Sequence, residues 1–152
     1  MAIHFDKFAQ EGNTFINELS EALGHKDESQ QTGILLRATL HTLRDSMTIA
    51  ESFHVMAQLP LLLKGLYVEN WQYGTGKPRF HIKTLKDFAR EVEIEQAKYG
   101  EAKFNWEQST IELVKDVFSC LGKYIDTGEY NHIKAQFPDE LAELFPTQAK
   151  AA

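Results

Sequence analysis

The sequence predicts an all-α protein, a helical bundle of two pseudo-twofold-related repeats with about four helices each. The first observation is an internal repeat: Glu51–Pro60 recurs as Glu129–Pro138, and five of the ten positions are identical. The second is helical periodicity of apolar residues at corresponding places in both copies. The third is the proline that ends each copy, because proline interrupts a helix and suits the start of a new one.

The expected organisation is one domain over residues 1–152. A chain of 152 residues, 43% of them hydrophobic, can bury about two-thirds of its unfolded surface in one core. We expect the repeats to span approximately residues 5–67 and 84–146. Residues 68–83 between them combine glycine, proline and aromatic side chains, which indicates a connecting loop.

In each repeat one long helix is expected to present a single apolar face. Four apolar residues step by four, three and four positions, and the same steps recur 78 residues later. These residues are Leu36, Leu40, Leu43 and Met47 in the first copy and Val114, Phe118, Leu121 and Ile125 in the second. Asp27 and Asn105, each followed three residues later by glutamine, are the expected caps of these helices.

The remaining helix starts are predicted in the same way. Thr48 and Asp126 are each followed three residues later by glutamate, so both are expected to cap the next helix. Pro60 and Pro138 are expected at the first position of a short final helix. An opening helix precedes each long one, and Thr84 is the expected cap of the second.

Composition excludes several function classes. A formal charge of −6 works against non-specific binding of nucleic acid, which needs clustered lysine and arginine. Cys120 is the single cysteine, so no internal disulfide can form, and the amino-terminal residues lack the pattern of a signal peptide. The longest apolar stretch, residues 59–68, is about half the length of a membrane span. We expect a cytoplasmic protein with no nucleic-acid partner, no membrane partner and no cofactor.

Several motifs carry a resemblance to a known family. The motifs are the paired Gln-Leu-Pro60 and Gln-Phe-Pro138, the segment Leu-Lys-Gly-Leu-Tyr67 with Trp71 beyond it, and the closing Glu-Leu-Ala-Glu-Leu-Phe145. Together, over roughly residues 8 to 146, they resemble the bacterial domain-of-unknown-function family 2267 (DUF2267). The resemblance implies an all-helical, cytosolic bacterial protein, and the family offers no established catalytic residues. The residues that match its pattern are Gln58, Pro60, Gly65, Tyr67, Trp71, Gln136 and Pro138.

A repeated Glu-x-x-His spacing suggests a metal site. Glu51 with His54, and Glu129 with His132, would each place two ligands on one helical face. Two such motifs, together with a glutamate from each of two other helices, build the di-metal site of ferritin-like bundles. The favoured alternative is that both glutamates complete helix caps, which explains them without a metal.

Two glutamines and a tryptophan form a second candidate site. Gln58 and Gln136 each lie at a helix break, where backbone groups need hydrogen-bond partners. A side-chain amide supplies both a donor and an acceptor, so the favoured interpretation is that these glutamines tie the broken backbone. The alternative is a ligand-binding site that also uses Trp71.

A difference between the repeats predicts an interaction surface. The first short helix carries Leu61, Leu62 and Leu63 where the second carries Asp139, Glu140 and Leu141. A helix that is apolar on most sides must be covered on most sides, by the connection, by the other repeat or by another subunit. Symmetric dimers are the commonest assembly, so we expect a homodimer or partner-binding surface near Leu61, Leu62 and Tyr67.

The function expected from the sequence is a non-enzymatic interaction or regulatory module. The alternative is an enzyme, or a small-ligand or metal-binding protein, with a site at the interface of the two repeats, lined by His54, His132, Gln58, Gln136 and Trp71. The two histidines on facing walls of one closed cavity would favour the alternative. Both histidines in solvent would favour the module.

Overall fold

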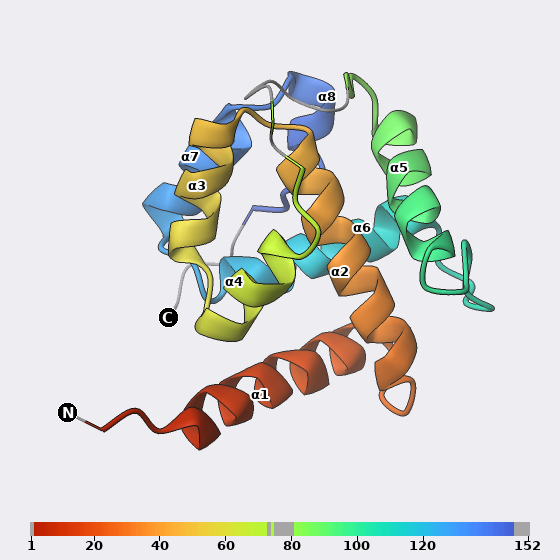
Figure 1. Cartoon of the computed structure of the whole chain (residues 1–152). Helices are drawn as coiled ribbons and strands as arrows, with labels where there is room; N and C mark the ends of the chain where they lie inside the picture. Colours follow the sequence, from red (N-terminus) through yellow and green to blue (C-terminus); the bar gives the residue numbers. More distant parts are fainter. Residues whose placement is uncertain (1, 73, 75–80, 148–152) are drawn as a thin grey trace.

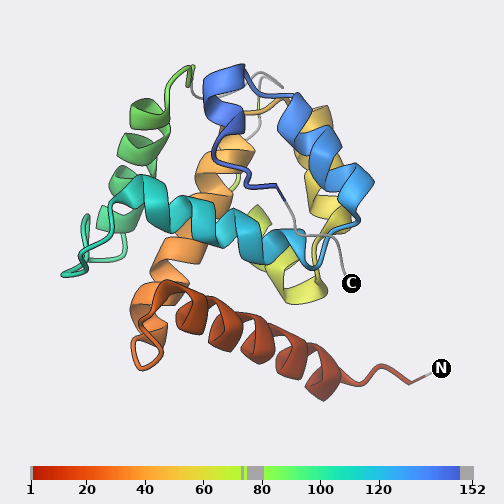
Figure 2. The same ribbon diagram turned by 180° about the vertical axis from the view of Figure 1, so that it is seen from behind.

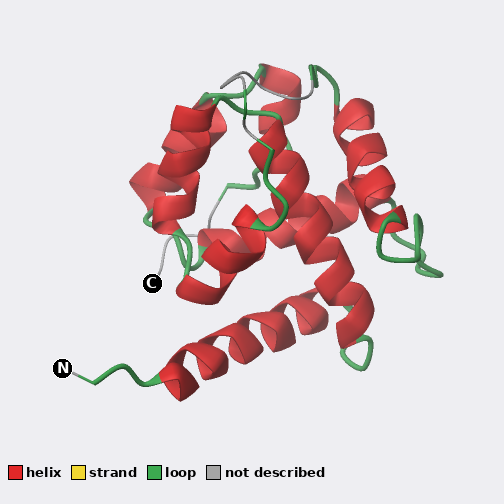
Figure 3. Cartoon of the chain, in the orientation of Figure 1, coloured by secondary structure: helices red, strands yellow, loops and turns green. Residues whose placement is uncertain are grey.

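The computed structural model describes residues 2–72, 74 and 81–147. In those residues the chain forms eight α-helices and no strand, which confirms the all-α prediction (Figure 3). The helices are α1 (Phe5–Leu23), α2 (Ser29–Asp45), α3 (Ile49–Gln58), α4 (Leu61–Val68), α5 (Leu85–Ala97), α6 (Thr110–Gly122), α7 (Thr127–Ala135) and α8 (Asp139–Ala142). None of these helices is long and apolar enough to cross a membrane.

Two helices, α2 and α6, cross at the middle of the molecule, and the others pack around them (Figures 1 and 2). Helix α1 packs on α2 and α6, and α5 packs on the same two helices. Helix α4 contacts α1, α2 and α3. Helices α3 and α7 lie beside one another on the side of the molecule away from α5. The result is a bundle with one continuous apolar interior.

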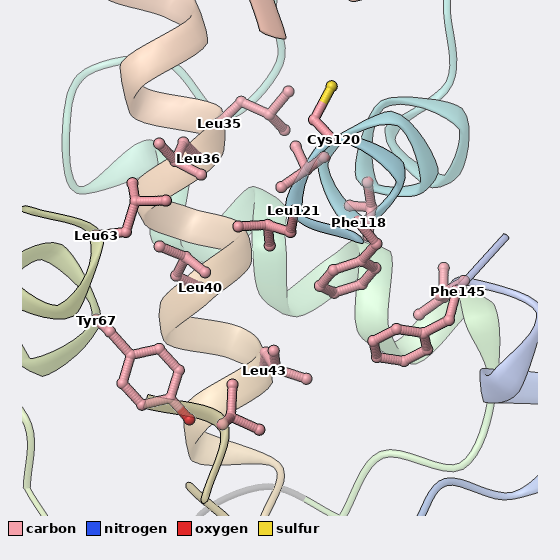
Figure 4. Close-up of a cluster of buried hydrophobic side chains, with 14 of the residues drawn as sticks. Leu35, Leu36, Leu40, Leu43, Leu63, Tyr67, Phe118, Cys120, Leu121 and Phe145 are labelled. Atoms are coloured by element: carbon pink, nitrogen blue, oxygen red, sulfur yellow. The ribbon is translucent and has the colours of Figure 1, made fainter. Parts of the chain in front are cut away.

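The core forms where α2 faces α6, α4 and the end of the chain. Leu40 and Leu43 of α2 lie near Phe118 and Leu121 of α6, with Phe145 packed behind them (Figure 4). The rings of Phe118 and Phe145 stack with centroids 4.4 Å apart. All eight periodic residues of the two predicted long helices are buried, although Met47 and Ile125 lie just beyond the ends of α2 and α6. The periodicity therefore predicted the buried face correctly.

Three of the predicted caps are confirmed. The Thr48 hydroxyl accepts a hydrogen bond from the Glu51 backbone N–H at 3.3 Å, and the Glu51 carboxylate accepts one from the Thr48 N–H at 3.1 Å. The Asp126 carboxylate accepts from the Glu129 N–H at 3.4 Å. The Thr84 hydroxyl accepts from the Asp87 N–H at 3.0 Å and starts α5.

The predicted caps at Asp27 and Asn105 are wrong. Helix α2 begins at Ser29, after Glu28, whose side chain makes no capping bond. Helix α6 begins at Thr110, where Ser109 and Glu112 each bond the other's backbone N–H. This reciprocal pair satisfies two free donors at once. Gln108, the expected partner of Asn105, instead donates to the backbone oxygen of Leu23 at 2.6 Å.

The predicted helix breaks at the two prolines are confirmed, with a shift of one position. Pro60 directly precedes α4 and Pro138 directly precedes α8, with φ and ψ of −55° and 153° at the first and −53° and 153° at the second. Both prolines are therefore extended cap residues and not the first helical residue. Helix α4 runs for eight residues and α8 for four.

Candidate functional site

The repeated Glu-x-x-His motifs meet where α3 lies beside α7. His54 Nε2 lies 2.6 Å from Glu129 Oε2, and the ring of His132 packs edge-on against the ring of His54, with centroids 5.0 Å apart. The His54 side chain is 42% exposed, and His132 is also exposed. The two histidines are therefore neighbours at the surface, in solvent, and do not face one another across a closed cavity.

Glu51, the remaining residue of the candidate metal site, is part of a helix cap. The carboxylate of Glu51 holds the first turn of α3 through its bond to the Thr48 N–H. Glu129, by contrast, uses its carboxylate on His54. Among the described residues, no group of three or more His, Cys, Asp or Glu side chains is placed to hold a metal ion.

The two glutamines lie at helix ends, as predicted. Gln58 is the last residue of α3, and Gln136 follows α7 as its carboxyl-terminal cap. The Oε1 atom of Gln136 is buried without a hydrogen-bond partner in the described part of the chain. That oxygen therefore does not tie the broken backbone.

Trp71 belongs to an aromatic cluster beside α3 and α4. Its ring centroid lies 5.5 Å from that of Phe53 and 6.1 Å from that of Tyr67. The guanidinium carbon of Arg44 lies 5.8 Å from the Trp71 ring centroid, within the range of a cation–π interaction. The part of the predicted connection at residues 73 and 75–80 lies outside the described residues.

A buried ion pair at the end of α2 was not predicted from the sequence. Arg44 and Asp45 are both nearly fully buried, and the guanidinium donates to both carboxylate oxygens at 2.9 and 3.1 Å. The same guanidinium donates to the backbone oxygens of Tyr67 and Glu69, each at 2.8 Å. Arg44 thus attaches the end of α4 to α2.

His41, one turn earlier on α2, makes a second attachment. Its Nε2 donates to the backbone oxygen of Leu66 at 2.7 Å, and its Nδ1 lies 3.8 Å from a carboxylate oxygen of Glu95. Burial lowers the pKa of His41, chiefly by desolvation, with Arg44 acting in the same direction. His41 is therefore a neutral donor that fixes the backbone of α4.

Held in this way, α4 buries one side and exposes the other. Leu63 and Tyr67 point into the core, with exposed fractions of 2% and 0%. Leu61 and Leu62 remain 47% and 45% exposed. The predicted interaction surface is therefore corrected at Tyr67, because a fully buried ring cannot contact another molecule.

An apolar groove runs between α1 and α4 beside these leucines. Its volume is about 480 Å³, and Ile16, Leu62 and Leu66 supply most of its apolar wall. Gly12 lies directly against Leu62: a Cβ atom at position 12 would lie 2.8 Å from Leu62 Cδ1, so a larger residue there would displace the Leu62 side chain. We call this groove, together with Leu61, the α1–α4 surface.

Cys120 is buried in α6 and contributes to packing. Burial, the largest cause, raises the pKa of its thiol, so the thiol stays protonated. A protonated, buried thiol is a poor nucleophile.

Comparison with known proteins gives a family and no activity. The family described as "Uncharacterized conserved protein (DUF2267)" matches residues 12–144, which include all the candidate residues above. No curated protein matches the chain.

Proposed function

This chain belongs to the DUF2267 family, and we propose that it is a non-enzymatic interaction module. In this proposal the chain pairs with a second copy of itself through the α1–α4 surface. The observation that carries the proposal is the exposure of two adjacent leucines, Leu61 and Leu62, beside an apolar groove. Contiguous exposed apolar patches are typical of contact sites, and here the two leucines adjoin the apolar groove.

The shape of the α1–α4 surface supports self-pairing. A twofold contact requires one surface to carry both a projection and a matching recess. Leu61, at the start of α4, is 47% exposed, and its neighbour Leu62 lines the groove. In a symmetric pair, Leu61 of each copy would enter the groove of the other.

The proposal includes the duplication inferred from the sequence, with repeats at approximately residues 5–67 and 84–146. Helix packing supports it: α1 packs on its own long helix α2 and on α6, while α5 packs on its own long helix α6 and on α2. A pseudo-twofold axis through the crossing of α2 and α6 would place α1 and α5 in equivalent positions, each packed on both long helices. The nearly equal backbone angles at Pro60 and Pro138 support it as well.

The alternative, an enzyme or a small-ligand or metal-binding protein with a site at the repeat interface, ranks second. It relies on His54 and His132, and both are exposed to solvent. Two imidazoles exposed in this way lack the enclosed surroundings that orient a substrate.

Sedimentation velocity over a range of protein concentrations tests self-pairing. We expect the wild type to form dimers and Leu61→Glu to weaken dimerisation by about thirtyfold or more, since a hot-spot side chain contributes about 2 kcal/mol or more. The matched control is Ile94→Glu on α5, where an isoleucine that is 48% exposed lies outside the α1–α4 surface. A wild type that stays monomeric at every concentration, or an equal loss in both variants, would contradict the proposal.

A further inference from the structure

A second cavity lies between α5, the loop of residues 98–109 and the start of α6. Its volume is about 270 Å³. That equals about nine water molecules at roughly 30 Å³ each, so the cavity can hold a small organic molecule. The elements that line it, α5 and the start of α6, lie on the side of the molecule opposite α3 and α7 (Figures 1 and 2). We call it the α5–α6 cavity.

The wall of the α5–α6 cavity contains a buried hydrogen-bond acceptor without a partner. Gln96 lines the cavity and is 1% exposed. Its Nε2 donates to the backbone oxygen of Ala102 at 2.7 Å, which fixes the orientation of the amide. Its Oε1 has no hydrogen-bond partner among the described residues. A buried acceptor left in this way is unfavourable, and a ligand N–H group would satisfy it. Because Gln96 is almost fully buried, the ligand N–H would reach this oxygen once the neighbouring side chains of the wall move aside.

A carboxylate lies on the same wall. Glu93 is three residues before Gln96 on α5, so both side chains lie on one face of that helix. Its Oε2 accepts a hydrogen bond from the Thr110 hydroxyl at 3.0 Å, which orients the carboxylate. An ionised carboxylate has further acceptor capacity. The wall therefore offers a neutral acceptor and a negatively charged acceptor to a ligand that carries several N–H donors.

Two aromatic rings complete the α5–α6 cavity. The centroids of Phe104 and Trp106 are 4.7 Å apart, with their planes at 46°. The indole of Trp106 stacks on the ring of His25 at 4.0 Å and donates to Glu28 at 2.9 Å. These contacts fix the indole before a ligand arrives. Aromatic rings attract flat apolar groups and cations.

From these four features we propose that the α5–α6 cavity binds a small aromatic cation of the amidine or guanidine class. The cationic N–H groups would donate to Gln96 Oε1 and to the Glu93 carboxylate, and the flat body would pack against Phe104 and Trp106. Lys103 also lines the cavity and opposes a cation, but its side chain is exposed, so solvent screens its charge. This inference does not depend on self-pairing through the α1–α4 surface.

The test uses benzamidine and the ¹⁵N-labelled chain of 152 residues. The chain has two tryptophans, and Trp71→Phe assigns the remaining indole N–H signal to Trp106. We expect benzamidine to shift the Trp106 signal in a saturable way. Benzamide has a similar shape without the charge and should bind more weakly, and benzoate, an anion of similar shape, should not bind.

Glu93→Gln should weaken benzamidine binding by about tenfold or more, because a charged acceptor becomes neutral. Glu91→Gln is the matched control, since Glu91 is on the same helix and does not line the cavity. The proposal is overturned if Trp106 shows no saturable shift, if benzoate binds as well as benzamidine, or if Glu93→Gln binds benzamidine as tightly as the wild type. Should Glu93→Gln fail to fold, the three probes on the wild type still decide the question.

Discussion

At the scale of single residues, the Arg44–Asp45 pair is an ion pair whose two side chains are both 3% exposed. The Nε and Nη2 atoms of the guanidinium donate to the Asp45 carboxylate, and Nη1 donates to two carbonyl oxygens at the end of α4. A buried cation is tolerated only while its partners remain. The stability of this region therefore depends on the pair as a unit.

Removing one member of the pair should be costly. We expect Asp45→Ala to lower the free energy of unfolding by about 3–5 kcal/mol, because the Arg44 cation stays buried without its counter-charge. Urea denaturation followed by circular dichroism measures the loss. The control is Asp87→Ala, which removes an ion pair with Arg90, whose side chain is 65% exposed. There the loss should stay below about 1 kcal/mol, and equal losses would contradict the prediction.

Sequence reasoning could not find this pair. Residues 44 and 45 are adjacent on a helix, and adjacent residues do not normally face one another, so no helical spacing points to the contact. The other partners of Arg44 are the backbone oxygens of Tyr67 and Glu69, more than twenty positions away. The burial of Leu40 and Leu43 was predictable because it repeats along one helix face. The partners of Arg44 were not, because they depend on how two helices meet.

At the scale of the helices, the start of α6 shows how two cap signals compete. Asn105 with Gln108 and Ser109 with Glu112 have similar spacing, and both could start the same helix. Ser109 and Glu112 satisfy each other's backbone N–H groups. Gln108 is meanwhile bonded to the Leu23 carbonyl and to His25. The local capping box of Ser109 and Glu112 therefore starts α6, and the tertiary contacts of Gln108, which the local sequence does not show, hold that side chain away from the rival cap.

This difference predicts unequal costs for two alanine substitutions. Ser109→Ala removes a capping acceptor and should lower the free energy of unfolding by about 1 kcal/mol. Asn105→Ala replaces an exposed residue that does not cap the helix and should change it by less than about 0.5 kcal/mol. Thermal unfolding of the two variants under identical conditions provides the comparison. A larger loss for Asn105→Ala would place the cap at the position expected from the sequence.

The candidate interaction surface was predictable only in part. The apolar run Leu61–Leu63 indicated a helix that needs cover on several sides, and the structure leaves Leu61 and Leu62 about half exposed. The sequence pattern of this helix could not distinguish Leu63 and Tyr67, which enter the core, from their neighbours. That distinction arises because Arg44 and His41 bond the backbone at the end of α4 and fix its rotation.

At the scale of the whole molecule, His41 links the stability of the fold to pH. It is almost fully buried, donates to the Leu66 carbonyl and faces Glu95, with Arg44 and Glu69 nearby. Desolvation lowers its pKa below the ordinary value of 6.5. Below pH 6.5 the unfolded chain therefore binds more protons at this position than the folded protein does.

It follows that the contribution of His41 to stability is fully present above pH 6.5 and decreases as the pH falls below that value. One such group changes the free energy of unfolding by at most about 1.4 kcal/mol per pH unit. His41→Gln keeps a side-chain N–H donor for the Leu66 carbonyl but cannot titrate. We expect urea denaturation at pH 7.5 and 5.5 to give a smaller pH-dependent loss for His41→Gln than for the wild type. Equal losses in the two proteins would mean that burial of this imidazole does not couple the fold to protons.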